Sequence, residues 1–389
     1  MSTAAKKVLP LIVLAQFACT SLWFAGNAVL PELQKEFELT ARSLGDLTSS
    51  VQFGFIVGTL VFALLTISDR FSPSKVFFVC ALAGALVNFS ITFVSSGWLL
   101  FPLRGFVGFF LAGIYPVGMK ISSDYFEKGL GKALGYLVGA LVIGTSIPHL
   151  IKMFGSGLSW HLVFYSTSIL AIIGGCLIYF LVPDGPFRKQ STKLDLSLCF
   201  VVFKEKRFRA AAFGYFGHMW ELYTMWAFIP FIITQYNSLQ NNSINVGLWS
   251  FLVIASGGLA CVLGGYLSDK KGSATTAFIA LLLSGVCCIV SIFSFQFSET
   301  LFLLFLLVWG MAVVADSPQF STLVAQYAPA SSKGTALTIV NSIGFAITIV
   351  SLQLMNVLIE NFDSQIVFAS LAIGPLLGLI AIGRPKPIA

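Results

Sequence analysis

Charged residues are scarce in this sequence. Asp, Glu, Lys and Arg make up 10% of its 389 residues, whereas 57% of the residues are hydrophobic and the mean hydropathy is +0.90. Soluble globular domains carry about 25% charged residues, which help to cover a surface that faces water. The composition therefore excludes an ordinary soluble protein and predicts an integral membrane protein.

The residue patterns of common enzymes are also missing. The sequence contains three histidines, and it has no Ser/His/Asp set, no HExxH motif and no phosphate-binding glycine loop. Its seven cysteines are scattered, six of them within apolar runs, without the spacing of a disulfide framework or a zinc site. We therefore predict a protein that is not an enzyme and that needs no cofactor and no bound metal.

Apolar runs fill most of the chain instead. Each is about twenty residues long, the length that a helix needs to cross roughly 30 Å of hydrocarbon. Turns or charges separate twelve such runs, which we place at 8–30, 46–67, 76–95, 98–120, 133–153, 161–182, 209–234, 246–267, 274–296, 300–323, 335–358 and 365–383. The pattern predicts an all-α integral membrane fold with twelve transmembrane helices.

Lys and Arg are divided unequally between the two sides of this topology. If the amino terminus is cytoplasmic, nineteen of the twenty-three lie on the inner side, and the outer side holds Lys35, Arg42 and Lys152. Such a bias is the positive-inside rule. We therefore expect both termini in the cytoplasm and a location in a cell membrane, most simply a bacterial inner membrane. The net charge of +7 then reflects topology and contact with anionic lipid in the bilayer, and it gives no reason to expect a nucleic-acid partner.

Two pairs of segments recur about two hundred residues apart. YPVGMKISSDYFEKGLGKALG, from Tyr115, is similar to SPQFSTLVAQYAPASSKGTAL, from Ser317. SDRFSPSK, from Ser68, is similar to SDKKGSAT, from Ser268. We infer an ancient duplication, a common origin of membrane transporters with a site between like halves. The predicted organisation is a six-helix bundle at 1–182, a basic cytoplasmic linker at 183–208 and a second six-helix bundle at 209–389.

The order of these features is similar to the major facilitator superfamily, whose members have six spans, a basic loop and six more spans. The turn after span 8 resembles the loop motif G-x-x-x-D-R-x-G-R-R of that family, and the turn after span 2 resembles it less completely. The matching residues are Gly265, Asp269, Lys270 and Gly272 in the second turn and Asp69 and Arg70 in the first, where Leu65 and Ser72 replace the glycines. Arg104 and Gly108 resemble the R-x-x-x-G signature of span 4, and GYLVGALVIGTSIP, from Gly135, resembles the glycine-rich span 5.

The resemblance implies a gating role for four charged residues of the two loop motifs, which are Asp69, Arg70, Asp269 and Lys270. A carboxylate beside a cation at a helix end can pair with a neighbouring helix or cap its amino terminus, and so hold a gate shut. The alternative is a solvated turn without a function.

Ionisable side chains are few within the spans, where a charge is costly and usually serves a task. His218 and Glu221 lie three residues apart in span 7, and we expect Glu221 to carry a coupling proton with His218 tuning it. The alternative for Glu221 is a structural hydrogen bond between helices. In span 10, Asp316 and Gln319 share a face across Pro318, and Asp316 either binds substrate or satisfies backbone amides.

Arg104 has three possible roles, namely holding an anionic substrate group, pairing with a buried acid, or extending its charge to the outer rim. Spans 1, 4, 7 and 10 line the cavity in the resembled family, and an aromatic cavity with a few polar groups suits a small polar organic molecule. The remaining predicted site residues are Tyr115, Trp23, Asn27, Trp220, Tyr223, Trp226 and Asn341.

Together these features predict a secondary active transporter that moves a small polar organic solute by alternating access, in symport with protons. We expect it to act as a monomer. Proton-driven efflux of a drug or metabolite is an alternative. The HxxxM pair of His149 and Met153 leaves a copper importer as a weaker one. A non-transporting membrane receptor is the alternative from a different class.

Overall fold

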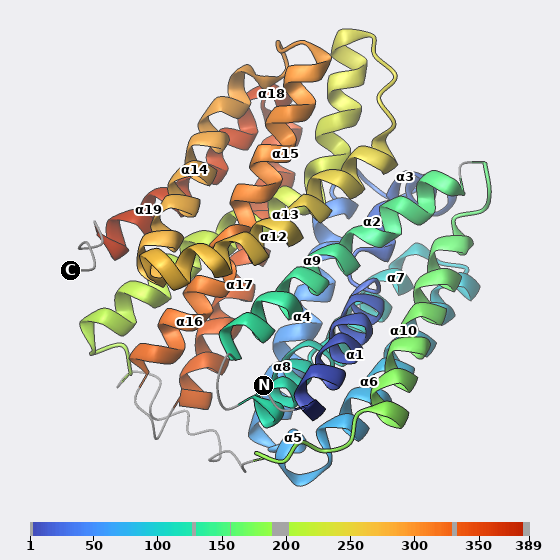
Figure 1. The fold of residues 1–389 in the computed structure, drawn as a ribbon. Helices are drawn as coiled ribbons and strands as arrows, with labels where there is room; N and C mark the ends of the chain where they lie inside the picture. The colour runs from blue at the N-terminus through green and yellow to red at the C-terminus, as the bar shows by residue number, and fades with distance from the viewer. Residues whose placement is uncertain (1–2, 127–129, 156, 189–201, 329–332, 384–389) are drawn as a thin grey trace. The chain divides into compact units, whose positions relative to one another are not determined.

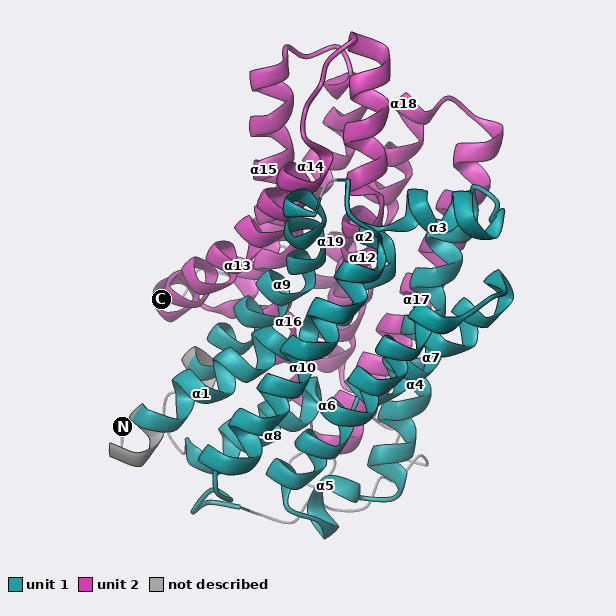
Figure 2. Cartoon of the chain, turned by 90° about the vertical axis from the view of Figure 1, so that its right-hand side faces the viewer, with its two compact units in different colours: residues 1–194 teal, residues 195–389 magenta. Residues whose placement is uncertain are grey.

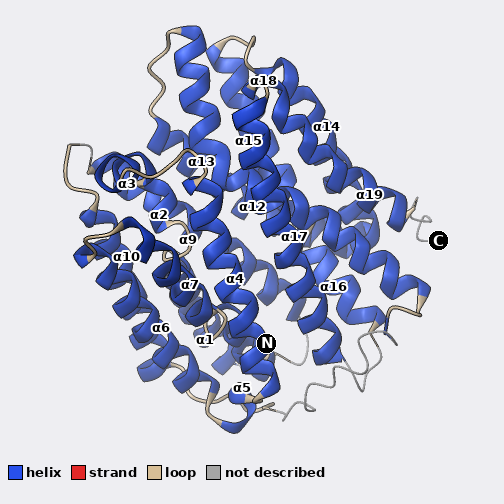
Figure 3. Ribbon diagram, turned by 180° about the vertical axis from the view of Figure 1, so that it is seen from behind, coloured by secondary structure: helices blue, strands red, loops and turns tan. Residues whose placement is uncertain are grey.

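The computed structural model describes residues 3–126, 130–155, 157–188, 202–328 and 333–383 (Figure 1). Within these ranges all regular structure is helical (Figure 3). Ten helical segments of the described residues are long and apolar enough to cross a membrane. Of the two other predicted spans, the first begins with the helix α1 and the seventh is contained in α12, so the chain has the twelve-span arrangement that its sequence predicts.

The chain divides into two compact units, residues 1–194 and residues 195–389 (Figure 2). Of the predicted linker at 183–208, residues 189–201 lie outside the described part of the chain, and the linker stays a prediction. The two serines with which a cytoplasmic location would be probed, Ser191 and Ser331, also lie outside it.

Unit 1 contains ten α-helices and two short 3-10 turns within the described residues. They are α1 (Thr3–Thr20), α2 (Ala25–Ala28), α3 (Leu30–Phe37), α4 (Ser43–Leu64), α5 (Ile67–Arg70), α6 (Pro73–Ser90), η1 (Ile91–Phe93), η2 (Gly97–Leu99), α7 (Leu100–Leu111), α8 (Tyr115–Tyr125), α9 (Leu130–Phe154) and α10 (His161–Leu181).

Unit 2 repeats this succession of long helices. Its described elements are α12 (Lys206–Gln240), α13 (Val246–Lys271), α14 (Ser273–Ser294), α15 (Glu299–Ala315), α16 (Ser317–Tyr327), α17 (Lys333–Asn361), α18 (Ser364–Val367), η5 (Phe368–Ala372) and α19 (Ile373–Ile382).

Three predicted spans are interrupted in the structure. The first was expected to be continuous from 8 to 30, but α1 ends at Thr20 and turns separate it from α2. The fourth and tenth spans break before Pro116 and Pro318, which lie in the first turns of α8 and α16. Proline lacks the amide hydrogen and clashes with the preceding turn, so a helix restarts there. The break after Thr20 has no such signal in the sequence, because no proline marks it and the residues on both sides are mostly apolar.

Glycines allow neighbouring helices to approach closely. A Cβ atom on Gly54 of α4 would lie 1.8 Å from the carbonyl oxygen of Gly105 in α7. In unit 2 a Cβ on Gly310 of α15 would lie 2.2 Å from the carbonyl oxygen of Val253 in α13. Larger residues at either position would separate the helices, so these glycines are packing residues.

Large apolar side chains lie on the outside of both units. Phe180 is 72% exposed and Ile380 is 69% exposed, and many other Leu, Ile and Phe side chains share this exposure. Water would make such a surface unfavourable, whereas lipid chains cover it at no cost. The chain is therefore a multi-pass membrane protein.

Candidate functional site

Glu221 lies in the interior of unit 2 with a ring of donors around its carboxylate. Its side chain, on α12, is 1% exposed. The hydroxyl oxygen of Ser284, on α14, lies 2.5 Å from both carboxylate oxygens. The indole nitrogen of Trp309, on α15, donates to Oε1 at 2.7 Å, and the thiol of Cys288 donates to the same oxygen at 3.1 Å. The carboxylate thus joins three helices, as the structural alternative for Glu221 expected.

His218 contacts a different carboxylate from the one that the sequence suggested. Its Nδ1 atom lies 2.8 Å from Oδ1 of Asp316, and both side chains are 1% exposed. No hydrogen bond between His218 and Glu221 is found in the described residues, so a tuning effect of His218 on Glu221 would act through Asp316 and stays a prediction. Residues three apart diverge by roughly 60° around a helix, which is enough to direct the two side chains to different neighbours.

Asp316 occupies the interruption between α15 and α16. Its backbone carbonyl accepts hydrogen bonds from the amides of Gln319, at 3.0 Å, and Phe320, at 2.9 Å. The carboxyl group contacts His218 and lies beside the backbone amides of Asp316 and Ser317. Its two expected roles, substrate binding and satisfying freed backbone amides, both stay predictions.

The buried charges of this region do not balance. Two carboxylates, Glu221 and Asp316, are accompanied by one imidazole, and no Lys or Arg contacts either of them in the described residues. Burying an unpaired charge is costly. One imidazole could not balance two ionised carboxylates. The cluster is therefore suited to taking up a proton.

The structure contradicts the outer-rim role expected for Arg104 and shows no acid partner in the described residues, while its role toward an anionic substrate stays a prediction. Its side chain, on α7, is 1% exposed, so it does not extend to an outer rim. The guanidinium donates to the carbonyls of Leu22, at 3.0 Å, and Trp23, and to Oδ1 of Asn88 at 3.2 Å. No acid contacts it among the described residues. Arg104 caps the carbonyls that are released where α1 ends, and this explains how the interruption of the first span is tolerated.

Asn88 extends this network across unit 1. Its amide nitrogen lies 3.0 Å from the hydroxyl oxygens of both Thr167 and Ser168 on α10, and 3.2 Å from the carbonyl of Phe164. Sequence reasoning missed Asn88, as it missed the donors Ser284 and Cys288. The available signal was a polar residue in the middle of an apolar run.

Two predicted site residues of unit 1 lie at the break between α1 and α2. The amide of Asn27 donates to the hydroxyl of Thr48 at 2.7 Å. The ring centroids of Trp23 and Phe55 are 5.0 Å apart. Tyr115 is the first residue of α8 and is half-buried. Their roles in substrate binding stay predictions.

The predicted residues of unit 2 separate into two groups. Tyr223 packs against Trp226, with centroids 5.4 Å apart, and Asn341 accepts a hydrogen bond from the hydroxyl of Tyr215 at 2.9 Å. Trp220 instead donates to the carbonyl of Ser370 in η5, at 3.4 Å. The structure therefore does not bring Trp220 together with Glu221, its neighbour in the sequence. Gln319 is buried at the start of α16.

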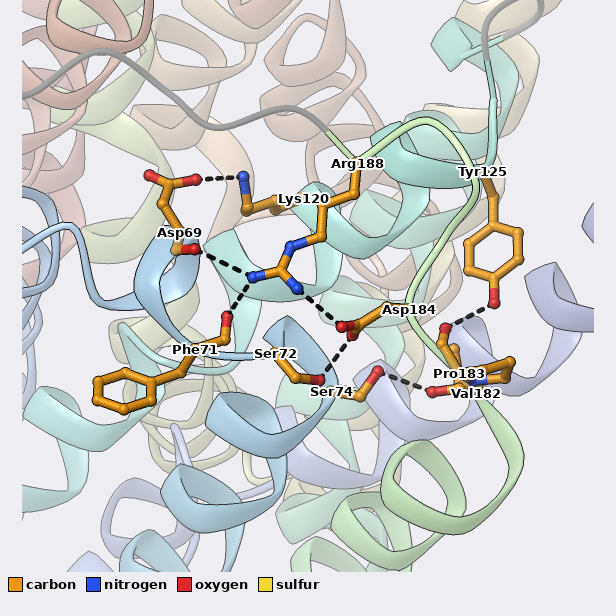
Figure 4. Close-up of polar contacts among 10 residues, drawn as sticks. All are labelled: Asp69, Phe71, Ser72, Ser74, Lys120, Tyr125, Val182, Pro183, Asp184 and Arg188. Atoms are coloured by element: carbon orange, nitrogen blue, oxygen red, sulfur yellow. Dashed lines mark hydrogen bonds and ion pairs between the residues drawn. The ribbon is translucent and has the colours of Figure 1, made fainter.

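The first loop motif is held by a dense set of polar contacts (Figure 4). The ammonium of Lys120, on α8, lies 2.6 Å from Oδ1 of Asp69, on α5. Arg188 donates to the backbone carbonyls of Asp69, at 3.0 Å, and Phe71, at 2.8 Å, and its guanidinium pairs with Asp184 at 2.8 Å. Asp69 thus pairs with a neighbouring helix, as expected of a gate. Arg70 is exposed at the end of α5.

The segment after α10 is fastened to the same region (Figure 4). The hydroxyl of Tyr125 donates to the carbonyl of Pro183 at 2.6 Å, and the hydroxyl of Ser74 donates to the carbonyl of Val182 at 2.7 Å. A Cβ atom on Gly185 would lie 2.4 Å from the carbonyl oxygen of Asp124, so no larger residue fits there. These contacts tie α6, α8 and the end of α10 to one another.

The second loop motif has a different local structure. Asp269 and Lys270 are exposed in the last turn of the continuous helix α13. In the first motif, by contrast, Thr66 has a φ of 51° and separates α4 from α5. A branched residue is strained in this left-handed region, which glycine adopts without cost. The gating role of both motifs stays a prediction.

Several curated proteins are similar to this chain, and most of them are named as transporters. The Bicyclomycin resistance protein homolog of Haemophilus influenzae is 23% identical over 342 residues, which cover 81% of this chain and 80% of that protein. The Benzoate transport protein of Acinetobacter baylyi is 22% identical over 349 residues, covering 78% and 72%. The Galacturonate transporter of Dickeya chrysanthemi is 25% identical over 186 residues, covering 42% and 53%.

Solved structures share the fold. The human organic anion transporter MFSD10 (TETRAN) is similar with a TM-score of 0.76 at 15% identity, covering 98% of this chain and 100% of that one. The nucleoside transporter NupG is similar with a TM-score of 0.73 at 18% identity, covering 96% and 98%. A family model described as Major Facilitator Superfamily matches residues 12–352. The chain therefore belongs to the Major Facilitator Superfamily and is a membrane transporter, not an enzyme.

Proposed function

We propose that this transporter is a proton-coupled symporter of a small polar organic solute, working by alternating access. The observation that carries the proposal is the charge imbalance in unit 2, where Glu221 and Asp316 are both buried and share one imidazole. Binding of a proton neutralises a buried charge and changes the relative free energies of the conformations. Glu221 is proposed to carry the coupling proton, and the Asp316 and His218 pair is the next candidate.

The names of several relatives support a small organic acid as the solute. Benzoate, galacturonate and niacin, named in three of them, are each a single carboxylate on a small ring. In this chain Arg104 is already occupied by backbone carbonyls, so we do not assign it to such an anion. In unit 1 Trp23 and Asn27, and in unit 2 Trp226 and Asn341, are each proposed to offer an aromatic face and an amide, which suit a small polar molecule.

One relative favours a second candidate. The Bicyclomycin resistance protein homolog matches 81% of the chain, so proton-driven efflux is the alternative. The same proton site would serve symport or efflux. The two differ in whether the solute moves with the proton or against it. The orientation with both termini in the cytoplasm follows from the distribution of Lys and Arg and belongs to the same proposal.

Uptake into proteoliposomes tests the proposal. Labelled galacturonate is offered with and without a pH gradient across the membrane, because benzoate and niacin can cross lipid as neutral acids and respond to the gradient without a transporter. If one proton crosses with each solute and the complex is neutral, a gradient of one pH unit can sustain about tenfold accumulation of the solute. We expect accumulation by the wild-type protein and only equilibration by Glu221→Gln, whereas exchange of labelled for unlabelled solute continues. Accumulation by Glu221→Gln would exclude Glu221 as the coupling site.

A further inference from the structure

We infer that Ser284 is a positioning residue for the proton on Glu221. Its hydroxyl holds the Oε2 atom of the carboxyl group in both the protonated and the deprotonated state, while Trp309 reserves Oε1 as an acceptor. This inference rests on the proposed role of Glu221, and it identifies which oxygen takes the proton and what receives it.

The indole of Trp309 decides which oxygen can be protonated. An indole N–H can only donate, and it lies 2.7 Å from Oε1 of Glu221. The thiol of Cys288, 3.1 Å from the same oxygen, is a weak donor. With these two groups directed at Oε1, a proton on that oxygen would meet an N–H that cannot accept it. Oε1 has two donors of its own and Oε2 has neither, so we place the proton on Oε2.

Ser284 is the only described residue that hydrogen-bonds to Oε2. Its hydroxyl oxygen lies 2.5 Å from Oε2 and also 2.5 Å from Oε1, where Trp309 and Cys288 already donate. A hydroxyl can donate one hydrogen and accept others. It donates to Oε2 when Glu221 is a carboxylate, and it accepts from the Oε2 hydrogen when Glu221 is a carboxylic acid. In the second state its own hydrogen turns to the carbonyl one turn earlier in α14, as buried serines in helices commonly do.

The other titratable groups near Glu221 are few and do not replace Ser284. Asp316 lies at the break between α15 and α16, and its oxygen is in contact with His218. The thiols of Cys287 and Cys288 are on α14. None of them contacts Oε2 in the described residues. A buried carboxyl group needs a hydrogen-bond partner when it is protonated and when it is deprotonated. Without one, the unsatisfied group costs about 1–3 kcal/mol of stability in either state.

The matched control is another serine of the same helix. Ser291 is 1% exposed, as Ser284 is, but its hydroxyl donates to the carbonyl of Cys288 and does not contact Glu221. The variants are Ser284→Ala, Ser284→Thr and Ser291→Ala, each in the full-length protein in liposomes without added solute. Infrared difference spectra recorded through a pH titration report the bands of carboxylic acids. The band that is lost in Glu221→Gln is the band of Glu221.

We expect the band of Glu221 to titrate in the wild-type protein and in Ser291→Ala with the same midpoint. In Ser284→Ala the midpoint should move to higher pH by about one unit, because a carboxylate loses a stronger hydrogen bond than an acid does. The acid band should also shift in frequency, and Ser284→Thr should restore both. If Ser284→Ala does not accumulate as folded protein, Ser284→Cys, with its weak donor, replaces it.

Two failures can be told apart. If no titrating band is lost in Glu221→Gln, the proposed coupling role of Glu221 fails and the inference fails with it. If that band is present but has the same midpoint and frequency in Ser284→Ala as in Ser291→Ala, the inference alone is overturned. The proposed coupling role of Glu221 is then still tested by pH-driven accumulation in proteoliposomes.

Discussion

The two units place charges of opposite sign in their interiors. Unit 1 buries the cation of Arg104 and fixes it on the carbonyls of Leu22 and Trp23. Unit 2 buries the carboxyl groups of Glu221 and Asp316, and no Lys or Arg contacts them in the described residues. The guanidinium in unit 1 is held mainly by backbone carbonyls, whereas the carboxyl groups in unit 2 are held by side chains that can donate or accept a proton. The first arrangement stabilises an interrupted helix, and the second is the one proposed to titrate.

The duplication inferred from the sequence allows single positions of the two units to be compared. With the offset between Pro116 and Pro318, Gln16 of unit 1 corresponds to His218 of unit 2. The structure agrees, because a Cβ atom on Gly118 would lie 2.5 Å from the side chain of Gln16, and the corresponding residue of unit 2, Phe320, packs near the ring of His218. The scaffold was thus kept while its polar side chains were exchanged.

The gate region diverged in the same way. Lys120, which pairs with Asp69 in unit 1, corresponds at the same offset to Thr322 in unit 2. The hydroxyl of Thr322 donates to the carbonyl of Pro318 in its own helix, at 2.8 Å. The ion pair between α5 and α8 therefore has no copy at this position of α16.

The largest effect is expected from removing the cation of unit 1. Arg104→Met leaves the carbonyls of Leu22 and Trp23 without their donor, and each buried bond to a charged group contributes about 1.5–3 kcal/mol. We expect a loss of at least about 3 kcal/mol of stability, seen as a lower melting temperature of the detergent-solubilised protein. A melting temperature like the wild type's, together with lost solute binding, would instead make Arg104 a substrate ligand.

The next largest effect is expected from substitutions of Asp316 and of its partner His218 in unit 2. Asp316→Asn removes the partner of His218, and His218→Ala removes the only imidazole near the two acids. Both should change the pH dependence of uptake, because the charge that accompanies Glu221 changes. Accumulation should fall severalfold without being abolished. If Asp316→Asn abolished accumulation while Glu221→Gln did not, the coupling proton would belong to Asp316.

The first two predictions concern residues that the sequence made visible to different degrees. An ionisable residue in an apolar run is a strong signal, so Arg104, Glu221 and Asp316 could all be selected from sequence. Their partners could not, because the donor to a buried group comes from another helix, and rotation about each helix axis is set by packing. For the same reason the sequence did not show that His218 contacts Asp316.

The fold was predictable further than the site. Span lengths and the charge bias depend on the bilayer, which acts on every residue in the same way. The restarts before Pro116 and Pro318 follow from proline chemistry. The break after Thr20 depends on Arg104, which lies 84 positions away in the chain, and no local pattern shows it.

A smaller effect is expected at the gate of unit 1. Lys120→Ala removes the partner of Asp69, and partly exposed ion pairs are worth about 1 kcal/mol or less. We expect turnover to change by up to about fivefold, with solute affinity nearly unchanged, because these residues lie outside the spans' interior. Thr322→Ala is the matched control at the corresponding position and should leave turnover as it is. Equal effects of both would show that the asymmetry of the gate has no consequence.

The smallest effect concerns two tryptophans of unit 2 that differ in what their indole nitrogens bind. Trp309→Phe removes an N–H that donates to Glu221 at 2.7 Å, whereas Trp220→Phe removes one that donates to the carbonyl of Ser370 at 3.4 Å. The second bond is long and neutral, so its loss should change stability by about 0.5 kcal/mol or less and leave the pH profile of uptake unchanged. Trp309→Phe should move that profile. A shift in Trp220→Phe as large as that in Trp309→Phe would show that the profile reports packing of α12 in general, and the titration would then no longer be specific to the surroundings of Glu221.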